Sequence, residues 1–250
     1  MIALVTGSSR GIGRAAAAAL ARAGFDVAVN APGGEDLGPA MAAVQAEGRR
    51  AHAAPFDVSD LGGHTAALDA IEDALGPLTC LVNNAGVGVL SRGDPLDATP
   101  ESWDRCMAVN ARGAFFLTQE VARRMLGRPR TGFRSVVTVS SANADAVAVP
   151  RAEYCASKAA AAMCSKVWAA RLGPEGIHAY DVRPGLIETD LTAPVIEDYK
   201  RRAAEGLCLL PRVGRPEEVG EVIATLASGH LPYVTAQSVA VDGGMLLPRF

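Results

Sequence analysis

Short apolar runs alternate with longer helical segments along the whole chain. The runs are rich in β-branched residues and alanine and end at glycine, asparagine or aspartate, which predicts buried parallel strands. We expect these strands at 2–5, 27–30, 50–56, 78–82, 135–139, 177–182 and 237–241. Helices are expected between them, at 14–23, 35–47, 61–75, 101–126, from 154 onward and at 216–227.

This continuous alternation predicts a single α/β domain over residues 1–250. No internal repeat, charge block or low-complexity linker divides the chain. Parallel strands joined by right-handed crossovers form a doubly wound sheet, here of seven strands, with helices on both faces and ligands at the carboxyl ends of the strands. Residues 191–210 carry few strand signals, and we expect them to form a substrate lid.

Composition and charge narrow the classes of partner. A formal net charge of −3 and a pI near 5.8 argue against a nucleic-acid binder, which is normally basic. Five cysteines lie scattered, without metal-ligand spacing, so we expect reduced thiols, no metal and a cytoplasmic location. No apolar run approaches the roughly 20 residues that span a bilayer, and 1–5 is too short for a signal peptide. No membrane association is expected.

A glycine-rich turn follows the first strand and opens the first helix. Glycines there let the backbone approach a ligand, and the free amides of the helix start favour phosphate; the alternative is a plain tight turn. Thr6 begins the pattern Thr-Gly-x-x-x-Gly-x-Gly, which resembles the signature of the short-chain dehydrogenase/reductase family. Asn83-Asn84-Ala85-Gly86, after the fourth strand, resembles a second signature. The resemblance extends over essentially the whole chain and implies a Rossmann fold.

The end of the second strand bears on which dinucleotide binds. An acid there usually accepts hydrogen bonds from the ribose 2′-hydroxyl, but Ala31 or Pro32 stands at that place. With no carboxylate to repel a 2′-phosphate and with Arg10 able to pair with one, NADP(H) is favoured. Glu35 and Asp36 could reach the ribose if the loop folds back, so NAD(H) remains possible.

Family resemblance extends the cofactor site along the chain. Asp57 matches a residue that contacts adenine, although capping the next helix is the alternative. The Pro-Gly turn after the sixth strand matches residues that hold the nicotinamide end. The cofactor-binding residues implied in this way are Gly7, Ser9, Arg10, Gly11, Ile12, Gly13, Asn30, Asp57, Val58, Asn84, Ala85, Gly86, Tyr154, Lys158, Pro184, Gly185, Ile187 and Thr189.

Tyr154 and Lys158 form the candidate acid/base pair. Four residues apart, they share one helix face, where an ammonium can lower the pKa of a phenol. Such pairs also occur by chance. Resemblance adds Ser141, thirteen positions upstream, as the hydroxyl that orients a carbonyl, leaving Ser140 to a turn. It also implies a catalytic role for Asn110, within a local kink whose carbonyl holds a water.

The implied activity is hydride transfer between a nicotinamide cofactor and a carbonyl or secondary alcohol. The 3-oxoacyl-(acyl-carrier-protein) reductase branch is the most similar, judged by 29–30, 184–190 and 241–245, with a polyol or sugar dehydrogenase as the alternative. Arginines at 123–134 could dock a carrier protein, but Glu175 departs from that pattern. A non-catalytic dinucleotide sensor is disfavoured because all four catalytic positions are filled. The alanine-rich helix after Tyr154 pairs between subunits in relatives, implying a homotetramer or homodimer.

Overall fold

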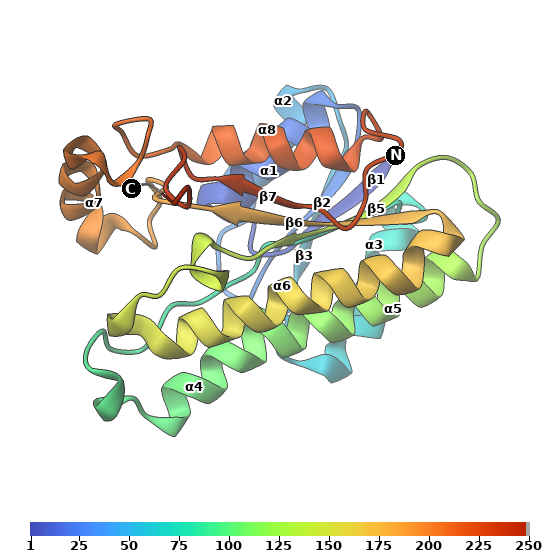
Figure 1. Ribbon diagram of the computed structural model, residues 1–250. Coiled ribbons are helices and arrows are strands. Elements are labelled where there is room, and N and C mark those ends of the chain that lie inside the picture. The colour runs from blue at the N-terminus through green and yellow to red at the C-terminus, as the bar shows by residue number, and fades with distance from the viewer. Residues whose placement is uncertain (249–250) are drawn as a thin grey trace.

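Residues 1–248 are described by a computed structural model, and they contain one parallel sheet (Figure 1). Its strand order in this part of the chain is β3-β2-β1-β4-β5-β6-β7, with every neighbouring pair parallel. The strands are β1 (Ile2–Val5), β2 (Asp26–Ala31), β3 (Ala51–Pro55), β4 (Cys80–Asn83), β5 (Arg134–Val139), β6 (Ile177–Pro184) and β7 (Ser238–Val241). The predicted doubly wound fold is confirmed, and the chain reverses its direction of winding between β1 and β4. Such a switch point opens a crevice at the carboxyl ends of the strands.

Helices cover both faces of this sheet (Figure 1). One face carries α1 (Gly11–Arg22), α2 (Gly38–Ala46) and α8 (Pro216–Ala227), and the other carries α3 (His64–Leu75), α5 (Ala114–Leu126) and α6 (Ala152–Leu172). Each face has its own apolar core, because strand residues alternate between the two sides. Leu20 and Ile223 pack with Val5 on the first side, and Leu68 and Leu117 pack with Leu4 on the second.

The helix after β2 begins later than its sequence pattern suggests. We predicted it from residue 35, but α2 begins at Gly38, where the Asp36 carboxylate accepts the Gly38 amide at 2.8 Å. Asp36 thus satisfies an amide of the first turn, as capping side chains do. This leaves Glu35 in an irregular loop beside the β1–α1 turn.

The long helix predicted at 101–126 is divided into three parts. α4 (Pro100–Met107) is followed by a π-helical stretch at Ala108–Gly113 and then by α5. At Gly113 the helix backbone touches a neighbouring loop so closely that a Cβ would lie 2.4 Å from the Val58 carbonyl oxygen. Wide helical turns of this kind are frequent at functional sites.

The segment predicted as a lid is helical. It contains α7 (Ile196–Arg202) and a wide turn at Ala203–Leu207. In Figure 1, α7 lies beyond the end of the sheet to which β6 and β7 point. A small core formed by Leu186, Tyr199 and Val213 attaches it to the chain after β6. Within residues 1–248, no helix is both long enough and apolar enough to cross a membrane.

Candidate active site

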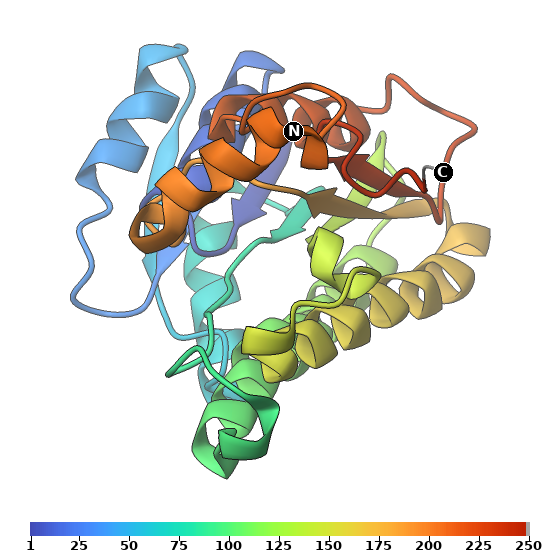
Figure 2. The same ribbon diagram turned by 60° about the vertical axis from the view of Figure 1, so that its left-hand side comes forward.

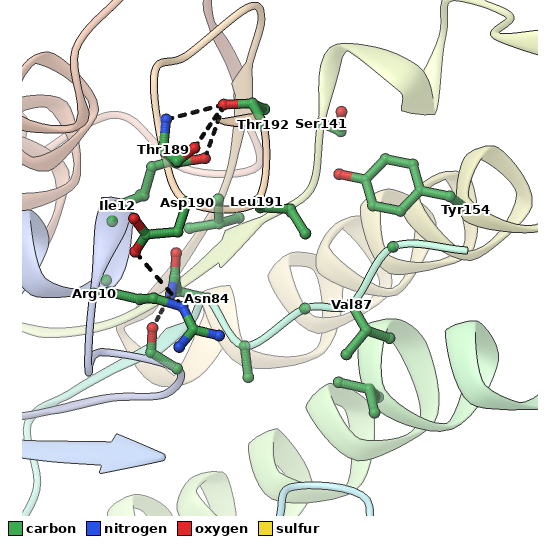
Figure 3. Close-up of a pocket in the computed structure, with 18 of the residues that line it drawn as sticks. Arg10, Ile12, Asn84, Val87, Ser141, Tyr154, Thr189, Asp190, Leu191 and Thr192 are labelled. Atoms are coloured by element: carbon green, nitrogen blue, oxygen red, sulfur yellow. Dashed lines mark hydrogen bonds and ion pairs between the residues drawn. The ribbon is translucent and has the colours of Figure 1, made fainter. Parts of the chain in front are cut away.

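A cleft of about 1050 Å³ lies at the carboxyl ends of the strands. It receives residues from the β1–α1 turn, the ends of β2, β4, β5 and β6, the start of α6, and α7. Figure 3 shows its lining from Arg10 at one end to Tyr154 at the other, and Figure 2 shows α7, in orange, well separated from the yellow start of α6. All of the predicted site residues line it except Asn110.

The glycine turn is built for close backbone approach. Gly7 has a φ of +60°, and a Cβ there would lie 2.7 Å from the Ala85 Cα. A Cβ on Gly13 would lie 2.2 Å from the Gly7 carbonyl oxygen. α1 begins without a side-chain cap, so its first amides keep their hydrogen-bonding capacity. These features fit a dinucleotide pyrophosphate, which needs free amides and no intervening side chain.

Asn84 joins this turn to the strand beside it. Its Nδ2 donates to the carbonyl oxygens of Thr6 and Gly7, both at 2.9 Å, and its backbone amide donates to the Thr6 hydroxyl at 3.0 Å. The amide of Ala85 also donates to that hydroxyl, at 3.0 Å. The two family-like signatures thus form one hydrogen-bonded floor.

The adenosine end contains two predicted residues that already have structural partners. Buried Asn30 accepts the Gly7 amide and donates to the carbonyl oxygens of Ala54 and Phe56, both at 2.9 Å. Asp57 accepts the amide and the hydroxyl of Ser59, each at 2.8 Å. Asn30 therefore fixes the shape of the cleft. Asp57 closes a turn with Ser59, whereas Asp60 caps the next helical turn at Leu61–Gly63, so contact between Asp57 and adenine stays a prediction.

An acid lies beside the arginine predicted to bind a 2′-phosphate. Glu35 accepts a hydrogen bond from the Ser9 hydroxyl at 2.6 Å, and its carboxylate lies 3.5 Å from the Arg10 guanidinium. Arg10 is also 3.7 Å from Asp190 on the opposite wall (Figure 3). The loop therefore folds back as the sequence allowed, and Arg10 is shared between two carboxylates.

Tyr154 and Ser141 face each other at the other end. Ser141 follows β5 and accepts the Asn143 amide at 3.1 Å, while the phenol hydroxyl of Tyr154 points toward Ser141 in Figure 3. Burial raises the pKa of Tyr154, and the Ser141 hydroxyl and the Arg151 charge oppose that rise. The phenol is consequently protonated at neutral pH, as a proton donor must be.

Lys158 lies buried behind Tyr154 on the next turn of α6. Its ammonium donates to the Val139 carbonyl oxygen at 2.9 Å and lies 5.8 Å from the centroid of the Tyr154 ring. Burial lowers the pKa of Lys158 to about 8, and the Asp181 carboxylate opposes that shift. The lowering of the phenol pKa by Lys158 stays a prediction; Ser141 and Arg151 are the groups that oppose the rise caused by burial.

Asn110 acts from behind the cleft wall. It lies within the π-helical stretch, and its side chain accepts the Val87 amide at 2.8 Å and donates to the Val87 carbonyl oxygen at 3.0 Å. The same Nδ2 donates to the Ser157 hydroxyl at 2.9 Å. Asn110 therefore connects the segment after β4 to α6, next to Lys158, and the wide turn corresponds to the kink that the resemblance implied.

The wall after β6 is held by local hydrogen bonds. Pro184, Gly185, Ile187 and Thr189 line the cleft as predicted. The Thr192 hydroxyl accepts the Thr189 amide at 2.9 Å (Figure 3) and donates to the Ile187 carbonyl oxygen at 2.6 Å. This small network fixes the turn that the resemblance assigns to the nicotinamide end.

Comparison with known proteins agrees with this geometry. A family model described as enoyl-(acyl carrier protein) reductase matches residues 7–246. The chain belongs to the short-chain dehydrogenase/reductase family. It is therefore an NAD(P)-dependent oxidoreductase that acts on CH–OH and C=O groups.

Three proteins similar to this short-chain dehydrogenase/reductase illustrate the range of named activities among its relatives. Gluconate 5-dehydrogenase of Gluconobacter oxydans is 34% identical over 247 residues, which cover 97% of this chain and 93% of the relative. A 3-oxoacyl-(acyl-carrier-protein) reductase of Staphylococcus aureus is 34% identical over 248 residues, covering 98% of both. The crystal structure of a 3-oxoacyl-(acyl-carrier-protein) reductase from Brucella melitensis with NAD has a TM-score of 0.96 and 37% identity, covering 100% of this chain and 98% of that one.

Several residues of this short-chain dehydrogenase/reductase line the site without having been predicted. Arg151 lies three positions before Tyr154, a spacing that could have drawn attention to it. Arg92 and Arg105 also line the cleft, but they come from a loop and from α4, and no local pattern links them. Tyr199 reaches the cleft from α7, where we expected a lid without assigning residues to it.

Proposed function

We propose that this enzyme is a ketoreductase of the 3-oxoacyl reductase type and that Tyr154 gives the proton to the carbonyl oxygen. One observation carries the proposal: the Tyr154 hydroxyl is directed toward Ser141 in the same cleft that has the glycine turn at its other end. A bound nicotinamide supplies or accepts the hydride. In the oxidative direction the same phenol takes the proton of the alcohol.

Ser141 and Lys158 have supporting roles in this proposal. The Ser141 hydroxyl donates to the carbonyl oxygen and stabilises the charge that develops there. Lys158, held by the Val139 carbonyl, keeps a positive charge near the phenolate that remains after proton transfer. Asn110 fixes the segment after β4 relative to α6 through its hydrogen bonds to Val87 and Ser157. That its backbone carbonyl holds a water stays a prediction.

Preference for NADP(H) also stays a prediction. It rests on Arg10 and on the absence of an acid at Ala31 and Pro32, and Glu35 opposes it. A 2′-phosphate can pair with Arg10 only after displacing the Glu35 carboxylate, to which it has the same sign of charge. NAD(H) needs no such displacement and remains the alternative.

A polyol or sugar dehydrogenase is the second candidate. Its support is the polar character of the cleft near Tyr154, where Arg92, Arg105 and Arg151 contribute to the lining. A long acyl chain gains little from such a surface, since apolar chains bind to apolar walls. A dinucleotide sensor without activity is disfavoured by the retained Tyr154, Ser141 and Lys158.

A substrate panel tests the proposal. The purified enzyme is assayed in both directions with β-keto esters, cyclic ketones, diketones and sugars, with NADPH and NADH at equal concentration. We expect reduction of at least one ketone, with transfer of deuterium to the carbonyl carbon from a cofactor that carries deuterium at both C4 positions. Turnover without deuterium in the product contradicts direct hydride transfer.

We also propose the assembly and the lid predicted from sequence. Leu191, Pro194 and Tyr199 line the cleft from the segment 191–210, which supports its role as a substrate lid over the single domain. Met163 and Val167 are half-exposed apolar residues on α6, which supports a homodimer or homotetramer formed through that helix. A cytoplasmic location stays a prediction from the scattered cysteines.

A further inference from the structure

Charged side chains that line the cleft are divided between its two ends. Within residues 1–248 the lining carboxylates are Glu35, Asp57 and Asp190. Glu35 and Asp190 both pair with Arg10, and Asp57 accepts hydrogen bonds from Ser59 after β3. All three therefore belong to the end of the cleft that contains Arg10 and the adenosine site.

The end that contains Tyr154 has the opposite charge. Arg151 lies beside Tyr154, and exposed Arg92 and Arg105 line the same cleft; in the described part of the chain none of the three forms an ion pair with a carboxylate. Arg105 donates to the Gly88 carbonyl oxygen at 3.2 Å, which leaves most of its guanidinium donors for a ligand. Three arginines without acidic partners in one cleft form an electrostatic site for an anion.

A set of hydrogen bonds holds the three arginine-bearing segments together. The Gly93 amide donates to the Pro150 carbonyl oxygen at 3.3 Å, joining the loop after β4 to the segment before α6. The Leu90 amide donates to the Ser102 hydroxyl at 3.2 Å, and that hydroxyl donates to the buried Glu153 carboxylate at 2.6 Å. The loop, α4 and the start of α6 are thus fixed relative to one another, which keeps the backbones that carry the three arginines close together.

Arg151 sets the distance between the anion and the reacting atoms. Its guanidinium carbon lies 5.3 Å from the centroid of the Tyr154 ring, so its charge is a few bond lengths from the phenol that protonates the substrate. A planar guanidinium matches a carboxylate through two parallel hydrogen bonds. The phosphate of a carrier-protein arm is separated from its thioester carbonyl by a long chain and does not suit this spacing.

We propose that Arg92, Arg105 and Arg151 bind a carboxylate on the substrate itself, a few carbon–carbon bonds from the carbonyl that Tyr154 protonates. This inference rests on the proposed reaction and specifies its substrate class: small keto acids in reduction and hydroxy acids in oxidation. Arg151 then has two effects. It binds the substrate carboxylate, and its charge opposes the rise in the pKa of Tyr154 that burial causes.

Calorimetric titration tests the site without requiring turnover. 5-Oxohexanoate and its methyl ester are each titrated into the enzyme saturated with the oxidised dinucleotide that it binds more tightly. We expect the acid to bind at least tenfold more tightly than the ester, about 1.4 kcal/mol. Equal dissociation constants overturn the proposal, and so does tighter binding of the ester.

Variants then locate the carboxylate. We expect Arg105→Gln and Arg92→Gln to weaken binding of 5-oxohexanoate at least fivefold and to leave the methyl ester within twofold. Arg123→Gln replaces an exposed arginine of α5 outside the cleft; it is the matched control and keeps the discrimination between acid and ester. If both cleft variants keep that discrimination, the arginines do not bind the carboxylate.

Kinetic measurements distinguish failure of this inference from failure of the proposed reaction. The acid and the ester are compared as substrates, or as competitive inhibitors of the reduction of any ketone that the enzyme accepts. Dihydroxyacetone phosphate is compared with dihydroxyacetone in the same way. A preference for phosphate without a preference for carboxylate overturns the carboxylate assignment while leaving ketone reduction intact. Carboxylate-selective binding in an enzyme that reduces no ketone overturns the proposed reaction instead.

Discussion

The charge states of Tyr154 and Lys158 depend on burial more than on pairing with other charges. Lys158 loses the hydration of its ammonium and keeps one backbone carbonyl, which lowers its pKa to about 8. Tyr154 is partly buried beside it, and this burial raises the pKa of the phenol. Protonated phenol and ammonium therefore coexist only below about pH 8.

We expect carbonyl reduction to slow as the pH rises through about 8. Above the pKa of Lys158 the folded enzyme holds a neutral amine, which no longer stabilises a phenolate, while the raised pKa of Tyr154 keeps the phenol protonated. A profile of kcat/KM from pH 6 to 10 measures this. Lys166→Met, which removes an exposed lysine from the same helix, should keep the decline, and a flat profile up to pH 10 contradicts the assignment.

Glu35 is expected to limit the use of NADPH. Replacing it with glutamine removes a carboxylate that repels a 2′-phosphate and frees Arg10, so the NADPH-to-NADH ratio of kcat/KM should rise at least tenfold, about 1.4 kcal/mol. Asp36→Asn is the control, because Asp36 is outside the cleft and its amide-accepting oxygen is kept. An unchanged ratio in Glu35→Gln excludes this residue from cofactor choice.

At the level of elements, strands were easier to predict than helix boundaries. β1 is an apolar run buried on both faces, and that composition is visible in the sequence alone. The wide turn at Ala108–Gly113 depends on contact between Gly113 and the Val58 carbonyl, two segments distant in the sequence. Local periodicity cannot report such a contact and predicts a continuous helix at 101–126, whereas the kink at Asn110 was implied only by the family resemblance.

α6 presents an apolar strip that we expect to bind a second copy of the chain. Met163 and Val167 are 59% and 51% exposed, one helical turn apart, and Phe116 of the neighbouring α5 is 38% exposed (Figure 1). Met163→Asp with Val167→Asp should reduce the mass measured by light scattering to that of a smaller assembly. Leu96→Asp, at a 91% exposed loop position, is the control, and an unchanged mass in the double variant rules out this helix as the interface.

For the molecule as a whole, the sequence predicted the sheet, the cleft and most of its lining. Glycine turns and strand ends are local features, and the topology of a doubly wound fold brings them together. The arginine site was not predicted, since Arg92, Arg105 and Arg151 come from three elements whose meeting depends on tertiary hydrogen bonds. The prediction of the cofactor preference was also incomplete, because Glu35 comes close to Arg10 only when the loop is folded.

Tyr154→Phe tests the central claim most directly. The variant keeps the ring under Arg151 and loses only the hydroxyl, and Tyr233→Phe, at a fully exposed tyrosine, is the matched control. With any ketone that the wild-type enzyme reduces, we expect Tyr154→Phe to lower kcat at least a hundredfold, the usual effect of losing a positioned proton donor. The dissociation constant of the dinucleotide should stay within a few fold of wild type. Ketone reduction at the wild-type rate in Tyr154→Phe contradicts the proposed role of this phenol.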